Sequence, residues 1–192
     1  MIAIVLGSSA AALNSSRAAQ AFLKAYGQEA LIVCVNDAIK FCPVKPDAFC
    51  TVQGGNVPLF LRPEVDMGGV MVYTRRRVHG VASRIVRPRW LGTSGLYAVQ
   101  IALEELGCDG VILAGCPMSA AAGTLAPEHS LMTDPDRVER YKPEWRTAMP
   151  AIAGRTRSMS GWTRELLGEP DNAWIDQLNA LRSAANMMEN AA

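Results

Sequence analysis

The sequence has few histidines, few lysines and no cysteine pair at the spacing of a metal knuckle. Its two histidines are His79 and His129. It has only four lysines but fifteen arginines. The five cysteines are an odd number and include no Cys-x-x-Cys pair, which argues against the common zinc motifs. We therefore expect reduced thiols that are mostly buried.

The sequence also lacks long apolar runs. No stretch approaches the roughly 20 apolar residues that a membrane helix needs. The N-terminal stretch MIAIVLGSSAAALNSS has no basic start of the kind found in signal peptides, and its apolar run is only one strand long. These absences predict a cytoplasmic protein without a membrane span.

Three glycine motifs that mark large enzyme classes are missing. The chain contains no GxGxxG, no GxxxxGK[ST] and no GxSxG. These absences argue against a nicotinamide enzyme, a P-loop kinase or ATPase, and an α/β-hydrolase. Asp37 follows Gly7 by thirty residues, whereas the ribose-binding acid of dinucleotide folds usually follows by about 20.

The apolar pattern that is present predicts an α/β fold. The chain has 192 residues, of which 49% are hydrophobic, and this is enough for one domain with a full core. Strands are predicted from apolar runs within 1–7, 30–37, 46–55, 68–77, 83–90 and 110–115. Helical patterns occupy 8–27 and 94–107. This alternation predicts a doubly wound, mainly parallel Rossmann-like sheet.

The C-terminal part has a different pattern within the same predicted single domain, 1–192. Residues 118–157 are rich in Pro, Ala and charged residues, and we expect an irregular insertion or lid there. Residues 158–190 are expected to form C-terminal helices. The apolar stripe of the last helix, from Trp174 to Met188, suits either the core or a contact in a homo-oligomer.

Polar and glycine residues follow most of the predicted strands. In open parallel sheets, ligands bind outside the carboxyl ends of the strands, so these residues should meet at one edge. Together with the turn before the 94–107 helix, the candidates are Gly7, Ser8, Ser9, Asn36, Asp37, Gln53, Arg75, Arg76, Arg77, Thr93, Ser94, Gly95 and Cys116.

Two of the candidate turns lead into helices, and both predict an anion site. Gly7-Ser8-Ser9 and Thr93-Ser94-Gly95 would offer backbone N–H groups and hydroxyls to phosphate at helix N-termini. The alternative is that these hydroxyls only cap their own helices. The segment between Asp66 and Glu104 has no acidic residue and seven basic ones. It suits a phosphate clamp, a nucleic-acid track or a solvated basic edge.

Acid–base chemistry has two candidate residues. His129 lies in the expected lid and is the preferred general base, and Asp37 is the candidate carboxylate. Asp37 could contact a base or ribose, or hold Mg²⁺ together with the phosphates of a nucleotide, because Mg²⁺ needs only one or two carboxylates.

Two stretches carry a resemblance to a known group of proteins. VNDAIKFCPVKPDAFCTVQ and GTSGLYAVQIALEELGCDGVILAGCPM resemble the Rossmann-like core of motility-accessory, sialyltransferase-related proteins and archaeal 6-hydroxymethylpterin pyrophosphokinases. The core also resembles phage and prophage members. The matching residues are Asn36, Asp37, Pro46, Asp47, Ser94, Gly107 and Gly115. Gln53 and Pro117 stand where the group tends to have acidic residues, which weighs against pyrophosphokinase chemistry.

The functional expectation is therefore a protein that binds a nucleotide or nucleotide-sugar and acts as a glycosyl- or diphospho-transferase. The alternative is a non-catalytic phage or prophage accessory protein. In that interpretation the Arg-rich edge binds nucleic acid or a protein partner.

Overall fold

The computed structural model describes residues 1–61, 65–126 and 134–189. Its seven strands form one sheet in the order β5-β4-β3-β2-β1-β6-β7, and every neighbouring pair is parallel. The strands are β1 (Ile2–Leu6), β2 (Ala30–Val35), β3 (Ala48–Thr51), β4 (Met71–Thr74), β5 (Arg84–Ile85), β6 (Gly110–Ala114) and β7 (Thr156–Ser158). The predicted doubly wound α/β fold is confirmed.

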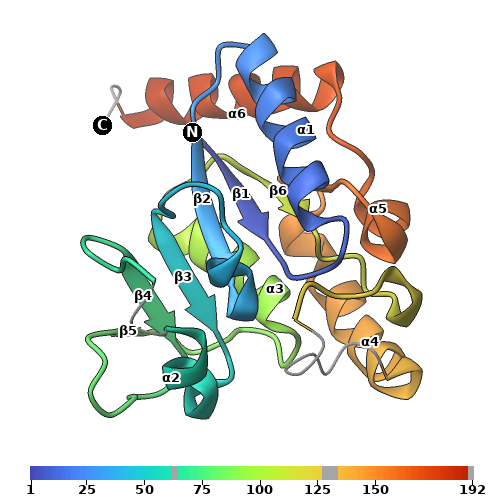
Figure 1. Cartoon of the computed structure of the whole chain (residues 1–192). Helices are drawn as coiled ribbons and strands as arrows, with labels where there is room; N and C mark the ends of the chain where they lie inside the picture. The colour runs from blue at the N-terminus through green and yellow to red at the C-terminus, as the bar shows by residue number, and fades with distance from the viewer. Residues whose placement is uncertain (62–64, 127–133, 190–192) are drawn as a thin grey trace.

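Helices cover both faces of the sheet (Figure 1). The α-helices are α1 (Ala12–Ala25), α2 (Val57–Phe60), α3 (Ser94–Gln100), α4 (Pro135–Ile152), α5 (Gly161–Leu167) and α6 (Asn172–Glu189). Short turns of other helix types are η1 (Asn36–Lys40), η2 (Gly54–Asn56), η3 (Ile101–Glu105) and η4 (Ala120–Ala122). The π-helical turn η3 continues α3 directly.

The alternation of side chains along β1 explains the two apolar layers. Ala3 and Val5 face the core that contains α3, α4 and α5, whereas Ile4 and Leu6 face the core under α1, α2 and α6. All of β1 is buried, because the strand lies inside the sheet, between β2 and β6. A strand covered on both faces needs apolar residues at every position, which is the pattern that predicted it.

The order of the strands reverses at β1. Residues Ile2–Leu6 pair with 30–34 of β2 on one side and with 110–114 of β6 on the other. Beyond these strands the chain continues to α1 on one face of the sheet and to α4 on the other, and ligands bind at such a reversal in this class of fold. The topology thus places the predicted candidates around one crevice.

The segment expected to be irregular contains a long helix instead. α4 begins after Asp134, whose side chain accepts a hydrogen bond from the Asp136 N–H at 3.0 Å, and Pro135 occupies the first turn. Val138, Trp145 and Ile152 bury the inner side of the helix. Pro143 and Pro150 contribute to the Pro-rich composition from which the irregular insertion or lid is predicted, and the helix forms in spite of them.

The apolar stripe of α6 divides into two parts. Trp174, Ile175 and Leu178 are buried, which supports the prediction of a core role for this half. Leu181 and Met188 are 50% and 76% exposed, and Figure 1 shows this end of the helix running out toward the C-terminus. None of the described helices is both long enough and apolar enough to cross a membrane. The cysteines are unpaired, as expected.

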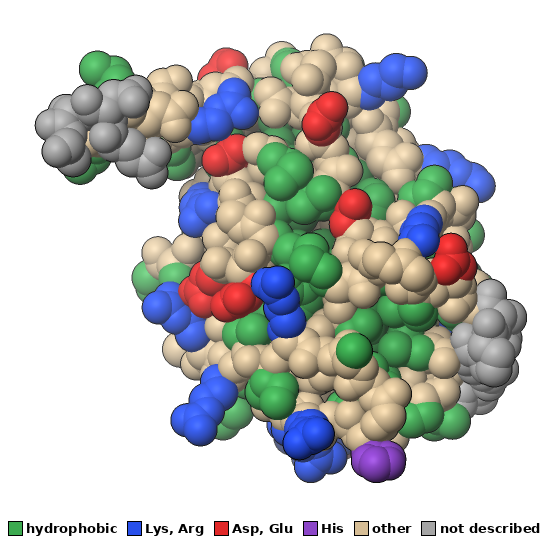
Figure 2. All heavy atoms as spheres, turned by 90° about the vertical axis from the view of Figure 1, so that its left-hand side faces the viewer, with side chains coloured by type: hydrophobic (Ala, Val, Ile, Leu, Met, Phe, Trp, Pro, Cys, Tyr) green, Lys and Arg blue, Asp and Glu red, His purple; other side chains and the backbone are tan. Residues whose placement is uncertain are grey.

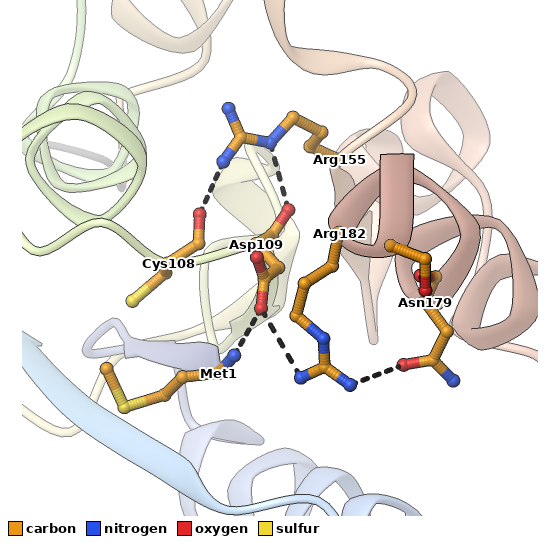
Figure 3. A network of polar contacts seen from close by, with 7 residues as sticks. Met1, Cys108, Asp109, Arg155, Asn179 and Arg182 are labelled. Atoms are coloured by element: carbon orange, nitrogen blue, oxygen red, sulfur yellow. Dashed lines mark hydrogen bonds and ion pairs between the residues drawn. The ribbon is translucent and has the colours of Figure 1, made fainter. Parts of the chain in front are cut away.

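A polar network ties the C-terminal elements to the amino end of β6 (Figure 3). The Arg155 Nε donates to the Asp109 carbonyl oxygen at 2.9 Å, and its Nη2 donates to the Cys108 carbonyl oxygen. The Asp109 carboxylate pairs with the amino group of Met1 and lies 3.9 Å from Arg182 Nη1. Arg155, which directly precedes β7, therefore links this strand to the residues just before β6.

Replacing Arg155 is expected to lower stability. Arg155→Met removes a charged donor from two carbonyl groups, and we expect the free energy of unfolding to fall by about 1–3 kcal/mol. Arg182→Gln is the matched control, since an exposed ion pair contributes about 1 kcal/mol at most. Urea denaturation of both variants checks this, and equal losses would show that Arg155 has no special role.

Candidate functional site

A cavity of about 390 Å³ opens at the carboxyl ends of the strands. The structure brings most of the predicted residues to its wall. These are Gly7, Ser8, Ser9, Asn36, Asp37, Gln53, Arg75, Thr93, Ser94, Gly95 and Cys116. His129 lies outside the described residues. The convergence follows from the parallel sheet, because every strand ends at the same edge.

The arginine triplet after β4 does not enter the cavity as a unit. Arg75 lines the cavity, whereas Arg76 and Arg77 are exposed and outside its lining. The Arg76 side chain passes Gly54, where an added Cβ would lie 3.5 Å from Arg76 Cγ. The predicted clamp of three arginines is therefore corrected to one arginine from this segment.

The floor of the cavity is formed by a close approach of two loops. A Cβ added to Gly7 would lie 2.2 Å from the Gly115 carbonyl oxygen and 2.6 Å from Cys116 Sγ. Gly115 has a φ of +77°, and a Cβ there would lie 2.4 Å from the Ala12 Cβ. Glycine is therefore required at both positions for the loops after β1 and β6 to meet.

The turn after β1 uses its backbone groups within the fold. The Gly7 N–H donates to the Ala114 carbonyl oxygen at 2.8 Å, and the Ser9 N–H donates to the Gly115 carbonyl oxygen at 3.2 Å. The Ser8 carbonyl oxygen accepts from the Leu125 N–H at 2.8 Å. The predicted phosphate contacts through the Gly7 and Ser9 amides are therefore wrong, because these amides already stabilise the loops.

The turn before α3 divides its two hydroxyls between two tasks. Thr93 Oγ1 accepts from the Leu96 N–H at 3.2 Å and so caps α3, which agrees with the capping alternative. Ser94 Oγ accepts from the Val52 N–H at 3.2 Å and so joins α3 to the end of β3. The two residues line the cavity and also fix the position of α3 against the sheet.

Asn36 and Asp37 begin the turn η1 after β2. Asn36 has a φ of +51°, and its Oδ1 accepts from Thr51 Oγ1 at 2.7 Å. The buried Asp37 accepts from Lys40 Nζ at 2.7 Å, so its negative charge is balanced within η1. Asp37 is the one carboxylate among the described lining residues.

The described cavity lining has a single carboxylate, Asp37, that could hold the predicted Mg²⁺. Within the described residues, no group of three or more His, Cys, Asp or Glu side chains is placed to hold a metal ion. Asp37 already accepts the Lys40 ammonium, which competes with a cation for its oxygen. The described lining therefore offers no site built from protein ligands alone, and Mg²⁺ shared between Asp37 and the phosphates of a nucleotide stays a prediction.

Cys116 lies at the floor, between the turns that contain Gly7 and Gly95. Burial raises the pKa of the Cys116 thiol to about 12, because the thiolate would lose its hydration there. Cys116 is therefore a protonated thiol at neutral pH. It contributes a small, uncharged surface to the cavity.

α4 supplies one wall of the cavity that the sequence analysis missed. Arg137, Tyr141 and Trp145 line the cavity from three successive turns of this helix, since they are spaced four residues apart. Their side chains are a guanidinium, a phenol and an indole, all of which donate hydrogen bonds. The sequence did contain a usable signal, because Asp134-Pro135 is a typical start of a helix.

The charges at the cavity favour an anionic ligand. Arg75 comes from the loop after β4, and Arg137 comes from α4, so the two guanidinium groups belong to different walls. The Asp37 carboxylate is paired with Lys40 and does not offset them. Two arginines are well suited to the oxygens of a phosphate, which they can bind in a bidentate manner.

Comparison with known protein families gives no match, and comparison with curated proteins also gives none. The resemblance to the motility-accessory and pyrophosphokinase group therefore stays a prediction.

Proposed function

We propose that the protein binds a nucleotide or nucleotide-sugar in this cavity and transfers a glycosyl or diphospho group from it. The observation that carries the proposal is the pair of arginines, Arg75 and Arg137, on different walls of a cavity at the carboxyl edge of a parallel sheet. The volume of about 390 Å³ lies in the range of small-molecule sites.

The lining suggests a division of roles. Arg75 and Arg137 would bind the phosphates and neutralise the charge that develops on a departing phosphate group. The buried Asp37 would accept hydrogen bonds from ribose hydroxyls while Lys40 balances its charge. Ser8, which lines the cavity at its glycine turn, would offer a hydroxyl to the ligand.

A thermal-shift screen tests the proposal. Nucleoside mono-, di- and triphosphates and nucleotide-sugars are added to the purified protein, with and without Mg²⁺. A ligand at 100 times its Kd stabilises the folded state by about 2.7 kcal/mol, which raises Tm measurably. A selective shift that survives moderate salt supports the cavity as the site. No shift with any of these compounds would contradict the proposal.

A second candidate function is supported by the exposed arginines near β5. Arg76, Arg77, Arg84 and Arg87 are all exposed, and the neighbouring Arg89 pairs with Glu104 at 2.9 Å. Figure 2 shows Lys and Arg side chains gathered beside a histidine at the lower part of this face. A non-catalytic accessory protein could use this edge to bind nucleic acid. Such binding would weaken steeply with salt and tolerate any base sequence, unlike nucleotide binding in the cavity.

A further inference from the structure

The four tryptophans differ in what their rings contact. Trp145 and Trp174 are fully buried in the two apolar cores. Trp162 is half-buried and packs against a cation, with Lys142 Nζ 5.2 Å from the centre of its ring. Trp90 is also half-buried and lines the cavity, but among the described residues no aromatic ring or cation lies over it. A partly exposed indole in a cavity wall is suited to contact a planar ring of a ligand.

Trp90 belongs to an apolar part of the cavity wall that reaches the solvent. Pro88 and Leu91 line the cavity beside it, and Leu91 is 76% exposed. The two guanidinium groups, of Arg75 and Arg137, come from other segments of the lining. The cavity therefore offers cations to one part of a ligand and an apolar surface to another. A nucleotide is divided in the same way, because its charged phosphates and its planar base lie at opposite ends of a sugar.

Side chains of α3 hold the loop that carries this indole. The buried Gln100 accepts from the Arg89 N–H at 2.8 Å through its Oε1 and donates to the Arg87 carbonyl oxygen at 3.2 Å through its Nε2. The Tyr97 hydroxyl donates to the Val86 carbonyl oxygen at 3.0 Å. Three hydrogen bonds to its backbone fix the loop against the helix. The indole is therefore preorganised, and a ring that stacks on it does not have to order the loop first.

The helix α4 packs against the same loop. A Cβ added to Gly92 would lie 3.5 Å from Glu144 Cβ, so the residues just after Trp90 contact this helix. Arg137 lies about two turns before Glu144, which corresponds to about 10 Å along the helix axis. Trp90 and Arg137 both line the cavity. One ligand that carries a ring and a phosphate apart from each other could therefore contact both residues.

We infer that Trp90 is the platform on which the planar base of the ligand stacks, and that it selects phosphate esters with an aromatic base over those without one. Stacking needs only a flat π face, so it favours a base without choosing strongly between bases. This inference rests on the proposed nucleotide site and assigns the recognition of the base to one side chain. The phosphates stay with the two arginines, because an apolar wall cannot replace their hydration.

Isothermal titration with uridine 5′-monophosphate, adenosine 5′-monophosphate and ribose 5-phosphate tests the inference. The wild-type protein should bind both nucleotides about tenfold more tightly than ribose 5-phosphate, which has the sugar and the phosphate but no base. Trp90→Leu removes the flat ring and keeps an apolar side chain. It should raise the Kd of both nucleotides about tenfold and leave that of ribose 5-phosphate unchanged. Trp90→Phe, which keeps a π face, should restore most of the affinity for the nucleotides.

Trp162→Leu is the control for this experiment. Trp162 is also half-buried, but it lies outside the described lining of the cavity and its ring already contacts Lys142. Its replacement should leave all three Kd values unchanged. Tryptophan fluorescence gives a second readout, because a base stacked on an indole quenches its emission. Both nucleotides should quench the wild-type protein and Trp162→Leu, and they should quench Trp90→Leu clearly less.

The outcomes separate this inference from the proposed function. If Arg75→Gln weakens all three ligands, but the wild-type protein binds ribose 5-phosphate as tightly as the nucleotides, the inference is overturned and the site stands. Unchanged nucleotide binding in Trp90→Leu has the same meaning. An equal loss of all three ligands in Trp90→Leu also overturns the inference, because Trp90 would then only support the cavity wall. If the wild-type protein binds none of the three, the proposed function fails and the inference fails with it.

Discussion

Gly7→Ala is expected to lower the free energy of unfolding by about 3 kcal/mol, the largest stability change that we predict for a single methyl group. The added Cβ would lie 2.2 Å from the Gly115 carbonyl oxygen, and a backbone atom cannot move aside as a flexible side chain can. Relief would require the loops after β1 and β6 to separate. That separation would break the hydrogen bonds from Gly7 to Ala114 and from Ser9 to Gly115.

Gly95→Ala is the control for this prediction, because it adds the same methyl group to another wall of the same cavity. Its nearest neighbours would be Cys116 Sγ at 3.5 Å and Thr93 Oγ1 at 3.6 Å, which are ordinary contacts. Alanine in the first turn of α3 should leave stability unchanged or raise it by about 0.5–1 kcal/mol. Urea denaturation compares the two variants. Similar stabilities would show that the loops after β1 and β6 are not in tight contact.

Arg75→Gln and Arg137→Gln are each expected to weaken nucleotide binding by about tenfold or more, and the double variant by about a hundredfold. A hydrogen bond from a charged group contributes about 1.5–3 kcal/mol, and one tenfold step in Kd corresponds to about 1.4 kcal/mol. The two arginines come from separate walls, the loop after β4 and the helix α4, so their effects should be nearly additive if each binds a different phosphate oxygen.

Arg77→Gln provides the comparison for the binding experiment. It removes the same charge two residues from Arg75 but outside the cavity lining, so it should change Kd less than twofold. Isothermal titration at two salt concentrations measures the four variants and the wild-type protein. If Arg77→Gln weakens binding as much as Arg75→Gln, the ligand binds to the basic edge and not to the cavity. That result would favour the accessory-protein function.

The sheet could be predicted from the sequence because its strands are covered on both faces. Ile2–Leu6 and Gly110–Ala114 are buried at every residue, so each strand reads as a continuous apolar run between glycines or polar residues. β7 could not be predicted in this way. Its three residues, Thr156–Ser158, have an edge position and polar side chains, and Thr156 and Ser158 are buried through contacts that come from other parts of the chain.

The position of the site could be predicted, but the use of its polar groups could not. The glycine turns after the strands converge as expected, since parallel strands end at one edge. Whether the Ser9 N–H binds a ligand or the Gly115 carbonyl depends on a contact between loops about a hundred residues apart. Arg137 and Trp145 could not be predicted because they reach the cavity only through the packing of α4. Pro143 and Pro150 lie inside this helix and weaken the helical pattern in the sequence.

Because β1 lies between β2 and β6, its pairing is completed late during synthesis on the ribosome. β1 is made first, yet its second neighbour is β6, residues 110–114. At about 5–20 residues per second, the nascent chain carries an apolar strand with an open edge for roughly 5–20 seconds. An open apolar edge recruits other strands. Fragments that end before β6 should therefore aggregate. The nascent chain should bind chaperones at the exit of the ribosome.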